Sequence, residues 1–308
     1  MKNISTTSYL AQEFISIIIP VFNDSARLKL CLQALENQTY SKDLYEVIVV
    51  DNASQEDIKS VVSQFSQAKF AYEATPSSYA ARNKGISLAK GEILAFTDAD
   101  CIPESDWIEK GVTSLTNTPN CGLVGGRIDI FFRNPEQPTP VELYDSIALK
   151  FTQESDVKNQ HFSATANLFT FKHVIDTVGG FDATLKSGGD REWGERVFQA
   201  GYKQVYADDA CIKHPARYSF SQLYTRVARF VGGKHDLFMR QNPSLWEIVE
   251  DFVGILKPPF RSFYRIFKNP QLHGTKQKLK YTLAMFFLRY VVISEKCRLY
   301  LGGTSRRE

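Results

Sequence analysis

The first hundred residues alternate between short apolar runs and amphipathic segments. The apolar runs are rich in β-branched side chains and predict buried strands at residues 15–21, 45–50, near 69–73 and at 92–97. The segments between them carry apolar residues at helical spacing and predict helices at 25–35, 58–65 and 80–89. This alternation is typical of the α/β class, in which a mostly parallel sheet is flanked by helices on both faces.

The second half of the chain has a weaker pattern. It predicts a strand with a glycine pair, a proline-rich loop, a helix and a strand of small residues, at 123–128, 134–140, 141–151 and 163–169. Helices are also expected to begin near Asp190 and to cover 224–230. The run Gly-Gly-Lys-His at 232–235 is expected to form a mobile lid.

Length and composition set limits on the function. The chain has 308 residues, enough to bury a sizeable core in one large domain or two, and its net charge of +3 is too small to indicate a nucleic-acid partner. The N-terminus lacks the pattern of a signal peptide, and no uncharged apolar run is long enough to span a bilayer. We therefore expect a cytoplasmic protein whose core holds its scattered cysteines in reduced form, Cys31, Cys101, Cys121, Cys211 and Cys297.

Two aspartates follow the strand at 92–97 directly, at the end where open α/β sheets bind their ligands. Because alternate residues of an extended chain point the same way, the carboxylates of Asp98 and Asp100 are expected to converge on one spot. Adjacent anions repel unless a cation lies between them, and oxygen ligands suit Mg²⁺ or Mn²⁺. The alternative is an ordinary turn before a helix that opens at Pro103.

The phosphate-binding loops of two large nucleotide-binding classes are absent from the sequence. A dinucleotide-binding dehydrogenase carries G-x-G-x-x-G after its first strand, whereas residues 20–23 read Pro-Val-Phe-Asn. The sequence also holds no Walker A loop. A sheet of nucleotide-binding type therefore needs another way to hold phosphate, and a metal ion bound by the two aspartates meets that need.

Four motifs, in this order, resemble family 2 glycosyltransferases with the GT-A fold, at 17–23, 49–54, 81–85 and 96–103. The last reads Phe-Thr-Asp-Ala-Asp-Cys-Ile-Pro and is close to the DxD stretch of that family. The resemblance covers about residues 15–217. It implies the mostly parallel GT-A sheet of a nucleotide-diphospho-sugar transferase, flanked by helices and followed by a C-terminal helical extension.

The resemblance implies a donor site at the carboxyl edge of the sheet, in which Asp51 contacts the base and Asp98 the ribose. It assigns the nucleotide sugar to Pro20, Phe22, Asn23, Asp51, Arg82, Asp98 and Arg217. It assigns the metal ion, Mg²⁺ or Mn²⁺, to Asp100 and His214, and this ion neutralises the charge of the leaving diphosphate. The structural alternatives are a helix cap for Asp51 and a solvated helix charge for Arg82.

Residues 187–196 resemble the G-E-D-x-D motif of the family at the start of a helix, with Gly189 in place of the acidic residue. By this resemblance Asp190 is the general base that takes the proton of the acceptor hydroxyl. The residues implied to contact or support the acceptor are Asn167, Glu192 and Trp193. The alternative for Asp190 is a helix cap with solvated acidic neighbours.

Beyond residue 220 the chain matches no motif of the family and mixes aromatic with basic residues at helical spacing. Such a mixture suits a membrane surface rich in anionic lipid. It suits equally a helical subdomain that packs on the sheet with its charges in water. We expect three parts, a flexible arm at 1–12, a catalytic domain at 13–220 and a helical extension at 221–308.

The resemblance implies an inverting glycosyltransferase of the hexosyltransferase class in polysaccharide or cell-envelope glycan synthesis. Its partners would be a nucleotide-diphosphate sugar donor and a glycan or lipid-linked acceptor, and not nucleic acid. It would act in the cytoplasm, with peripheral attachment to the inner face of the membrane through the C-terminal helices. Two other functions stay open: a non-catalytic nucleotide-sugar-binding protein whose altered motif at Gly189 has lost turnover, and a glycosidase that uses two carboxylates.

Overall fold

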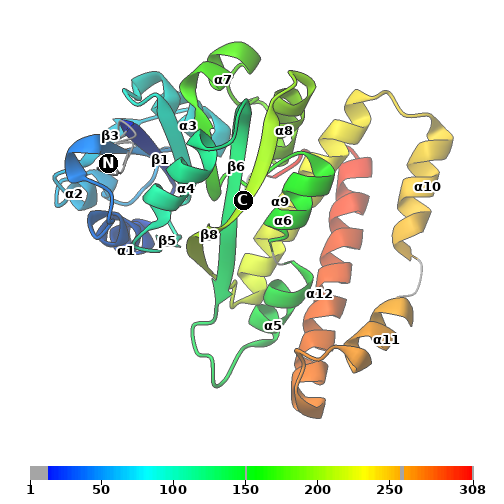
Figure 1. The fold of residues 1–308 in the computed structure, drawn as a ribbon. Coiled ribbons are helices and arrows are strands. Elements are labelled where there is room, and N and C mark those ends of the chain that lie inside the picture. The colour runs from blue at the N-terminus through cyan, green and yellow to red at the C-terminus, as the bar shows by residue number, and fades with distance from the viewer. Residues whose placement is uncertain (1–12, 150, 257–259, 307–308) are drawn as a thin grey trace, which may run out of the picture.

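The computed structural model describes residues 13–149, 151–256 and 260–306. They form an eight-stranded sheet with strand order β3-β2-β1-β4-β7-β6-β8-β5, covered by helices (Figure 1). The strands are β1 (Ile15–Val21), β2 (Tyr45–Asp51), β3 (Ala68–Tyr72), β4 (Ile93–Thr97), β5 (Ile102–Pro103), β6 (Cys121–Phe131), β7 (Asn167–Phe171) and β8 (Lys203–Pro215).

The helices fall into two groups, those that lie between the strands and those that follow the last strand. Those among and between the strands are α1 (Ser25–Glu36), α2 (Ile58–Val62), α3 (Ser78–Leu88), α4 (Trp107–Thr116), α5 (Pro140–Ala148), α6 (Gln153–Gln160), α7 (Lys172–Val178) and α8 (Gly189–Gln199). After β8 come α9 (Phe220–Arg240), α10 (Leu245–Leu256), α11 (Phe260–Lys268) and α12 (Gly274–Tyr300). A short 3-10 turn, Lys42–Leu44, leads into β2.

One half of the sheet is parallel and the other half is mixed. The strands β3, β2, β1 and β4 run parallel to one another, so their carboxyl ends meet at one edge. The strand β7 is antiparallel to both of its neighbours, β4 and β6, while β6 and β8 are parallel and β5 is antiparallel to β8. The predicted class, a mostly parallel sheet flanked by helices, is confirmed.

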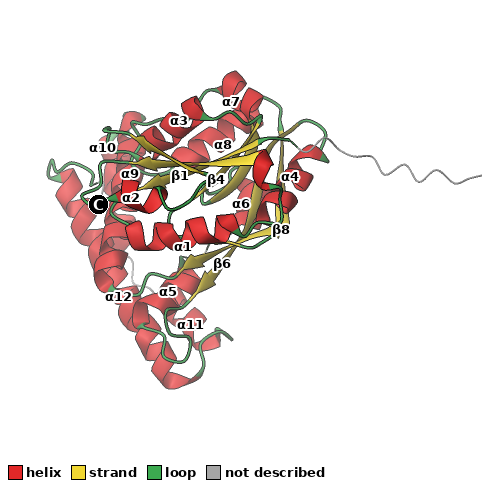
Figure 2. Cartoon of the chain, turned by 90° about the vertical axis from the view of Figure 1, so that its left-hand side faces the viewer, coloured by secondary structure: helices red, strands yellow, loops and turns green. Residues whose placement is uncertain are grey.

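Side chains of the parallel strands alternate between two cores, because successive residues of a strand point to opposite faces. Ile17 and Ile19 of β1 belong to the core that α1, α2 and α4 cover, whereas Ile18 belongs to the core of α3, α7 and α8. Figure 2 shows α3 and α7 on one side of the sheet and α1 on the other. Burial on both faces explains why these strands read as unbroken apolar runs.

The C-terminal helices share their cores with α5 rather than with the sheet. Val141 of α5 packs with Leu223 of α9 and Val291 of α12. A second cluster joins the other side of α5 to α11 and α12 through Tyr144 and Met285. Figure 1 shows α9 and α12 side by side beside the sheet, which agrees with their packing. Among the described helices, none is both long and apolar enough to cross a bilayer.

Several elements differ from the sequence prediction. The pattern did not reveal α4, α6, α7 or the long strand β8, whose residues are mostly polar or charged outside its buried end. The helix predicted at 141–151 ends at Ala148, and the strand predicted at 163–169 begins only at Asn167. A search for apolar runs does not detect a polar strand, because the burial of such a strand comes from the elements that pack on it and not from its own composition.

The lid predicted at 232–235 is wrong. These residues lie inside the continuous helix α9, which begins with a capping box between Ser219 and Gln222. Gly232 and Gly233 are buried, and they pack so closely that a Cβ there would lie under 3 Å from Ser305 and Ser187. The expected core cysteines are all free and four of them are buried, whereas Cys297 on α12 is only partly so.

The close packing of α4 on β7 gives a test of the fold. A Cβ at Gly111 in α4 would lie 2.2 Å from the ring of Phe169 in β7. We expect Gly111→Ala to lower the free energy of unfolding by about 1–3 kcal/mol, because a packed core has no room for the extra methyl group.

The matched control is Gly254 in α10, where none of the described residues comes within 4 Å of the Cβ position. There Gly254→Ala is expected to raise the free energy of unfolding by about 0.5–1 kcal/mol, through better helix propensity. Urea unfolding followed by circular dichroism measures both changes. Equal effects at the two glycines would contradict the packing of α4 on β7.

Candidate active site

A cavity of about 730 Å³ lies at the carboxyl edge of β1 and β4. Its walls come from the end of β1, the start of α3, the segment after β4, the loop before α8, the end of β8 and the middle of α9. Six of the predicted site residues line it and carry ionisable groups: Arg82, Asp98, Asp100, Asp190, His214 and Arg217. Residues more than a hundred positions apart therefore share one site.

Arg82 joins α3 to the end of β4. Its Nη2 atom donates a hydrogen bond to Oδ1 of Asp98 at 2.5 Å, while the side chain is almost fully buried. The Nε–H group of Arg82 has no partner among the described residues. An unused guanidinium donor in the wall of a cavity fits an anionic ligand, because a buried N–H without an acceptor is costly.

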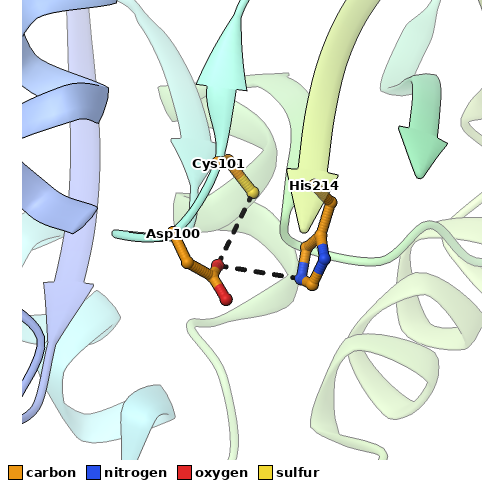
Figure 3. Close-up of side chains that lie close together, drawn as sticks. All are labelled: Asp100, Cys101 and His214. Atoms are coloured by element: carbon orange, nitrogen blue, oxygen red, sulfur yellow. Dashed lines mark hydrogen bonds and ion pairs between the residues drawn. The ribbon is translucent and has the colours of Figure 1, made fainter. Parts of the chain in front are cut away.

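Asp100 lies between a cation and a histidine. Its Oδ2 atom is 3.3 Å from Nη1 of Arg27 in α1, and its Oδ1 atom is 3.7 Å from Nε2 of His214 at the end of β8. The thiol of Cys101 also donates to Oδ1, at 3.9 Å. Figure 3 shows the three side chains of Asp100, Cys101 and His214 turned toward one another.

The tautomer of His214 decides what this group can bind. Nδ1 of His214 lies 2.8 Å from the carbonyl oxygen of Pro215, which can only accept, so Nδ1 carries the ring proton. In the neutral ring Nε2 then faces the carboxylate of Asp100 with a lone pair. Two acceptors that face each other need a proton or a cation between them. One carboxylate and one imidazole therefore fit a divalent metal ion.

The sulfur of Cys101 is the least suited of the three groups to a hard metal ion. Burial, together with the charges of Asp100 and Asp98, raises the pKa of the Cys101 thiol well above its ordinary value. Only the thiolate binds metal strongly, and a neutral thiol is a poor ligand for a hard ion. The chemistry of the site therefore favours Mg²⁺ or Mn²⁺ over a thiolate-bound metal.

Asp190 lies in the first turn of α8 and lines the same cavity. Burial raises the pKa of its carboxyl group, although the backbone N–H of Arg191 and the charge of Arg82 oppose this. The hydroxyl oxygen of Tyr79 accepts a hydrogen bond from the N–H of Gly189 at 2.9 Å. The preceding loop is thus tied to α3.

The glycine at position 189 has a structural reason. A Cβ there would lie 2.7 Å from the ring of Tyr79, so Tyr79 occupies the space that a side chain at 189 would take. An acidic side chain at position 189, as the family motif would have it, would overlap the ring of Tyr79 in this arrangement.

A buried carboxylate organises the arginines of the cavity. Asp145 in α5 is 1% exposed and pairs with Nη1 of Arg226 at 2.8 Å and with Nη1 of Arg217 at 3.3 Å. Arg217 and Arg226 both line the cavity, and burial lowers the pKa of Arg226 to about 10. Two guanidinium groups share one carboxylate here, which leaves positive charge available for an anion.

The remaining residues predicted to bind the donor lie at or beside the cavity. Pro20 and Phe22 line it. Asp51 and Asn23 do not, because their side chains hold the neighbouring loop: Oδ1 of Asp51 accepts from the N–H of Ser54, and Oδ1 of Asn23 accepts from that of Gln55.

The three residues predicted for the acceptor side do not line the cavity. Asn167 is fully buried, accepts a hydrogen bond from Nε1 of Trp107 and donates to two backbone carbonyls. Trp193 is also fully buried and donates to the carbonyl of Gly179. Glu192 forms an ion pair with Arg196 on its own helix.

Sequence reasoning did not assign several charged or aromatic residues of the cavity wall to the site, among them Tyr79, Arg191, Arg226, Arg229 and Lys234. The spacing of the two arginines in the helix around 224–230 was visible in the sequence, but no motif connected that helix with the site. The pairing with Asp145 that directs Arg226 exists only in the folded chain.

Comparisons with known proteins show the family of this chain. Residues 16–183 match the profile of Glycosyl transferase family 2. The glycosyltransferase AglE of Haloferax volcanii is 38% identical over 296 residues, which cover 93% of each chain. A dolichyl N-acetyl-α-D-glucosaminyl phosphate 3-β-D-2,3-diacetamido-2,3-dideoxy-β-D-glucuronosyltransferase of Methanococcus voltae is 25% identical over 71% of this chain and 70% of its own.

A solved structure has the same fold. The mannosyltransferase PcManGT from Pyrobaculum calidifontis, in complex with GDP-Man and Mn²⁺, superposes with a TM-score of 0.63. It is 17% identical, and the match covers 95% of this chain and 89% of the other. The expected GT-A-type fold and the expected enzyme class are thus confirmed, and the chain is a glycosyltransferase that belongs to Glycosyl transferase family 2.

Proposed function

We propose that this enzyme transfers a sugar from a nucleotide-diphosphate sugar to a hydroxyl group of a glycan or lipid-linked acceptor, with inversion at the anomeric carbon. The observation that carries the proposal is the convergence of Asp98, Asp100, His214 and Asp190 in one cavity. A carboxylate and an imidazole that can share a metal ion, together with a separate carboxylate of raised pKa, are the groups that such a reaction needs.

The donor is proposed to bind along the edge of the sheet from β1 to β8. Pro20 and Phe22 at the end of β1 border the base and ribose, with Asp51 and Asn23 holding the loop behind them. Arg82 offers its unused Nε–H to a phosphate oxygen while it keeps Asp98 in place.

A divalent ion is proposed to be held by Asp100 and His214, with diphosphate oxygens as further ligands. When bound, this ion neutralises charge that develops on the leaving diphosphate. Arg217 lines the same cavity and adds a positive group for the diphosphate. The Mn²⁺ in the complex of PcManGT supports an ion of this kind.

Asp190 is proposed as the general base. Its carboxylate takes the proton from the acceptor hydroxyl, the hydroxyl oxygen forms the new bond to the anomeric carbon, and the bond to the diphosphate oxygen breaks with its electron pair on the diphosphate. A single displacement of this kind inverts the anomeric configuration.

Asn167 and Trp193 are proposed to support the site from within the core, through the hydrogen bonds to Trp107 and Gly179. Glu192 supports α8 through its ion pair with Arg196.

We also propose that the enzyme works at the cytoplasmic face of a membrane, with residues 13–220 as its catalytic domain and 221–308 as its attachment. The helices α10 to α12 expose large apolar side chains: Leu245, Trp246, Val249, Val253, Tyr264, Phe267, Leu279, Leu283, Phe286 and Tyr290. In α11 and α12 the sequence places basic residues among them, whereas the charged residues of α10 are acidic. Such a surface suits an anionic lipid interface. The lipid phosphate in the name of the Methanococcus voltae relative supports an acceptor of this class.

Donor identity can be tested without knowledge of the acceptor. A panel of nucleotide-diphosphate sugars is incubated with the enzyme and Mn²⁺, and the released nucleotide is read by mass spectrometry. We expect one donor to be hydrolysed or transferred far faster than the others, because a few groups in the cavity select the sugar. Absence of release from every donor would contradict the proposed function.

Replacement of the proposed metal ligands gives a second test. We expect Asp100→Ala and His214→Ala to abolish the Mn²⁺ dependence of nucleoside-diphosphate binding, measured by isothermal titration calorimetry. The control is Cys101→Ala, which removes the neighbouring protonated thiol and should leave that dependence intact. An equal loss in the cysteine variant would contradict the proposed ligand set.

The role of Asp190 is separable from donor binding. We expect Asp190→Asn to keep nucleotide affinity and to lower the transfer rate by about 10²–10⁴-fold, the usual contribution of a general base. Glu195→Gln on the exposed side of the same helix serves as the control and should transfer at the wild-type rate. A parallel loss of donor affinity in Asp190→Asn would argue for a binding role instead.

The raised pKa of Asp190 predicts the pH dependence. A base is active only when ionised, and burial extends the protonated form to higher pH than for an exposed aspartate. Activity should therefore fall on acidification at a pH clearly above about 3.9, the ordinary pKa of aspartate. The measurement is kcat/KM against pH, and an acid limb at or below that ordinary value would contradict the role of Asp190.

A further inference from the structure

A second cavity, of about 660 Å³, lies between the helices α9, α10 and α12. Its walls are mostly apolar and include Val227 and Phe238 of α9 and Leu288 and Val292 of α12. A volume of this size is in the range of pockets that hold small molecules, roughly 300–1,000 Å³. Neither the match to the family profile, which ends at residue 183, nor the proposed reaction uses this cavity.

The second cavity adjoins the first. The residues that border both cavities are Leu149, Arg226, Phe230, Lys234 and Leu237. Four of these five belong to α9, so this helix forms the boundary between the two spaces. The two cavities are therefore neighbours that share these wall residues.

The boundary carries positive charge. Arg226 is held there by the buried carboxylate of Asp145, and Lys234 lies with Nζ 4.5 Å from the ring centre of Phe230. On the catalytic side Arg217 and Arg229 add two further cations, and Asp145 is shared between Arg217 and Arg226. At the other end of the second cavity, Asp251 is neutralised by its ion pair with Lys296.

Apolar walls behind a cationic boundary match one kind of molecule, a hydrocarbon chain that ends in a phosphate. We propose that the second cavity holds the first part of the hydrocarbon chain of a lipid-linked acceptor, with its phosphate beside Arg226 and Lys234 and its acceptor hydroxyl in the first cavity. This inference rests on the proposed function and names the acceptor class. The chain beyond the cavity would leave past α10, whose Leu245, Trp246 and Val249 are exposed.

The test uses three probes on the full-length enzyme: farnesyl phosphate, farnesol and inorganic phosphate. Each is titrated by calorimetry, and the two farnesyl compounds are kept below the concentrations at which they aggregate. We expect farnesyl phosphate to bind at least about tenfold more tightly than either of the others, because only it uses both the apolar walls and the cationic boundary. Equal binding of inorganic phosphate would show a simple anion site, and equal binding of farnesol would show a simple apolar cavity. Either result would overturn the proposal.

Two pairs of variants locate the binding. Val292→Trp fills the second cavity and should weaken farnesyl phosphate binding about tenfold or more, whereas Leu30→Trp on the exposed face of α1 should not. Lys234→Met removes a boundary cation and should weaken farnesyl phosphate but not farnesol, whereas Lys276→Met, which is exposed on α12, should change neither. Wild-type binding of farnesyl phosphate by both Val292→Trp and Lys234→Met would overturn the assignment.

Mn²⁺-dependent nucleotide binding, measured on the same samples, separates this inference from the proposed function. Retained nucleotide binding with no preference for farnesyl phosphate rejects the lipid site alone. Farnesyl phosphate binding without any nucleotide binding would reject the proposed donor and leave the lipid site in place. If Val292→Trp also loses nucleotide binding, its loss of farnesyl phosphate binding is not specific. The comparison of Lys234→Met with its control Lys276→Met then decides whether the lipid site exists.

Discussion

The site depends on the balance of negative charge at the end of β4. Asp98 and Asp100 follow that strand directly, and their carboxylates are held by cations from both faces of the sheet, Arg82 from α3 and Arg27 from α1. His214 approaches Asp100 from β8, with Nε2 3.7 Å from Oδ1 of that carboxylate. Like charges at this edge of the sheet are tolerated only with cationic partners, and an oxygen and a nitrogen at this separation are placed to share a bound cation.

The rest of the cavity is built around this edge by segments from the second half of the chain. The family profile ends at residue 183, before Asp190, His214 and Arg217. These residues come from the helix α8 and from the end of β8, and α5 and α9 supply the buried pair of Asp145 and Arg226. Helix α9 therefore completes the wall of the first cavity, and together with α10 and α12 it borders the second cavity.

The sequence was sufficient to predict the elements whose hydrophobic pattern matches the way they pack in the fold. Buried parallel strands read as apolar runs, and the aspartates that end them were found because strand ends and ligand sites coincide in this fold class. The strand β8 was missed since its residues are mostly polar and its pairing with β6 contains register shifts. Helix α9 was found only in part, because the glycine pair suggested a loop whereas close contact with Ser187 and Ser305 requires glycine there.

Side-chain roles were harder to predict than elements. The sequence could not show that Tyr79 fills the space beside Gly189, or that Asn167 is fully engaged with Trp107 and the backbone. Both facts depend on contacts between residues 40 to 110 positions apart, which no local spacing encodes. The same holds for the arginines that Asp145 directs into the cavity.

The most direct test of the account is the ligand set of a bound metal ion. Pulsed electron paramagnetic resonance of Mn²⁺ with the enzyme and a nucleoside diphosphate detects nitrogen and phosphorus nuclei in direct contact with the ion. The account predicts coupling to one imidazole nitrogen and to phosphorus, with the nitrogen signal absent in His214→Ala. A spectrum without nitrogen coupling, or one that His214→Ala leaves unchanged, would contradict it.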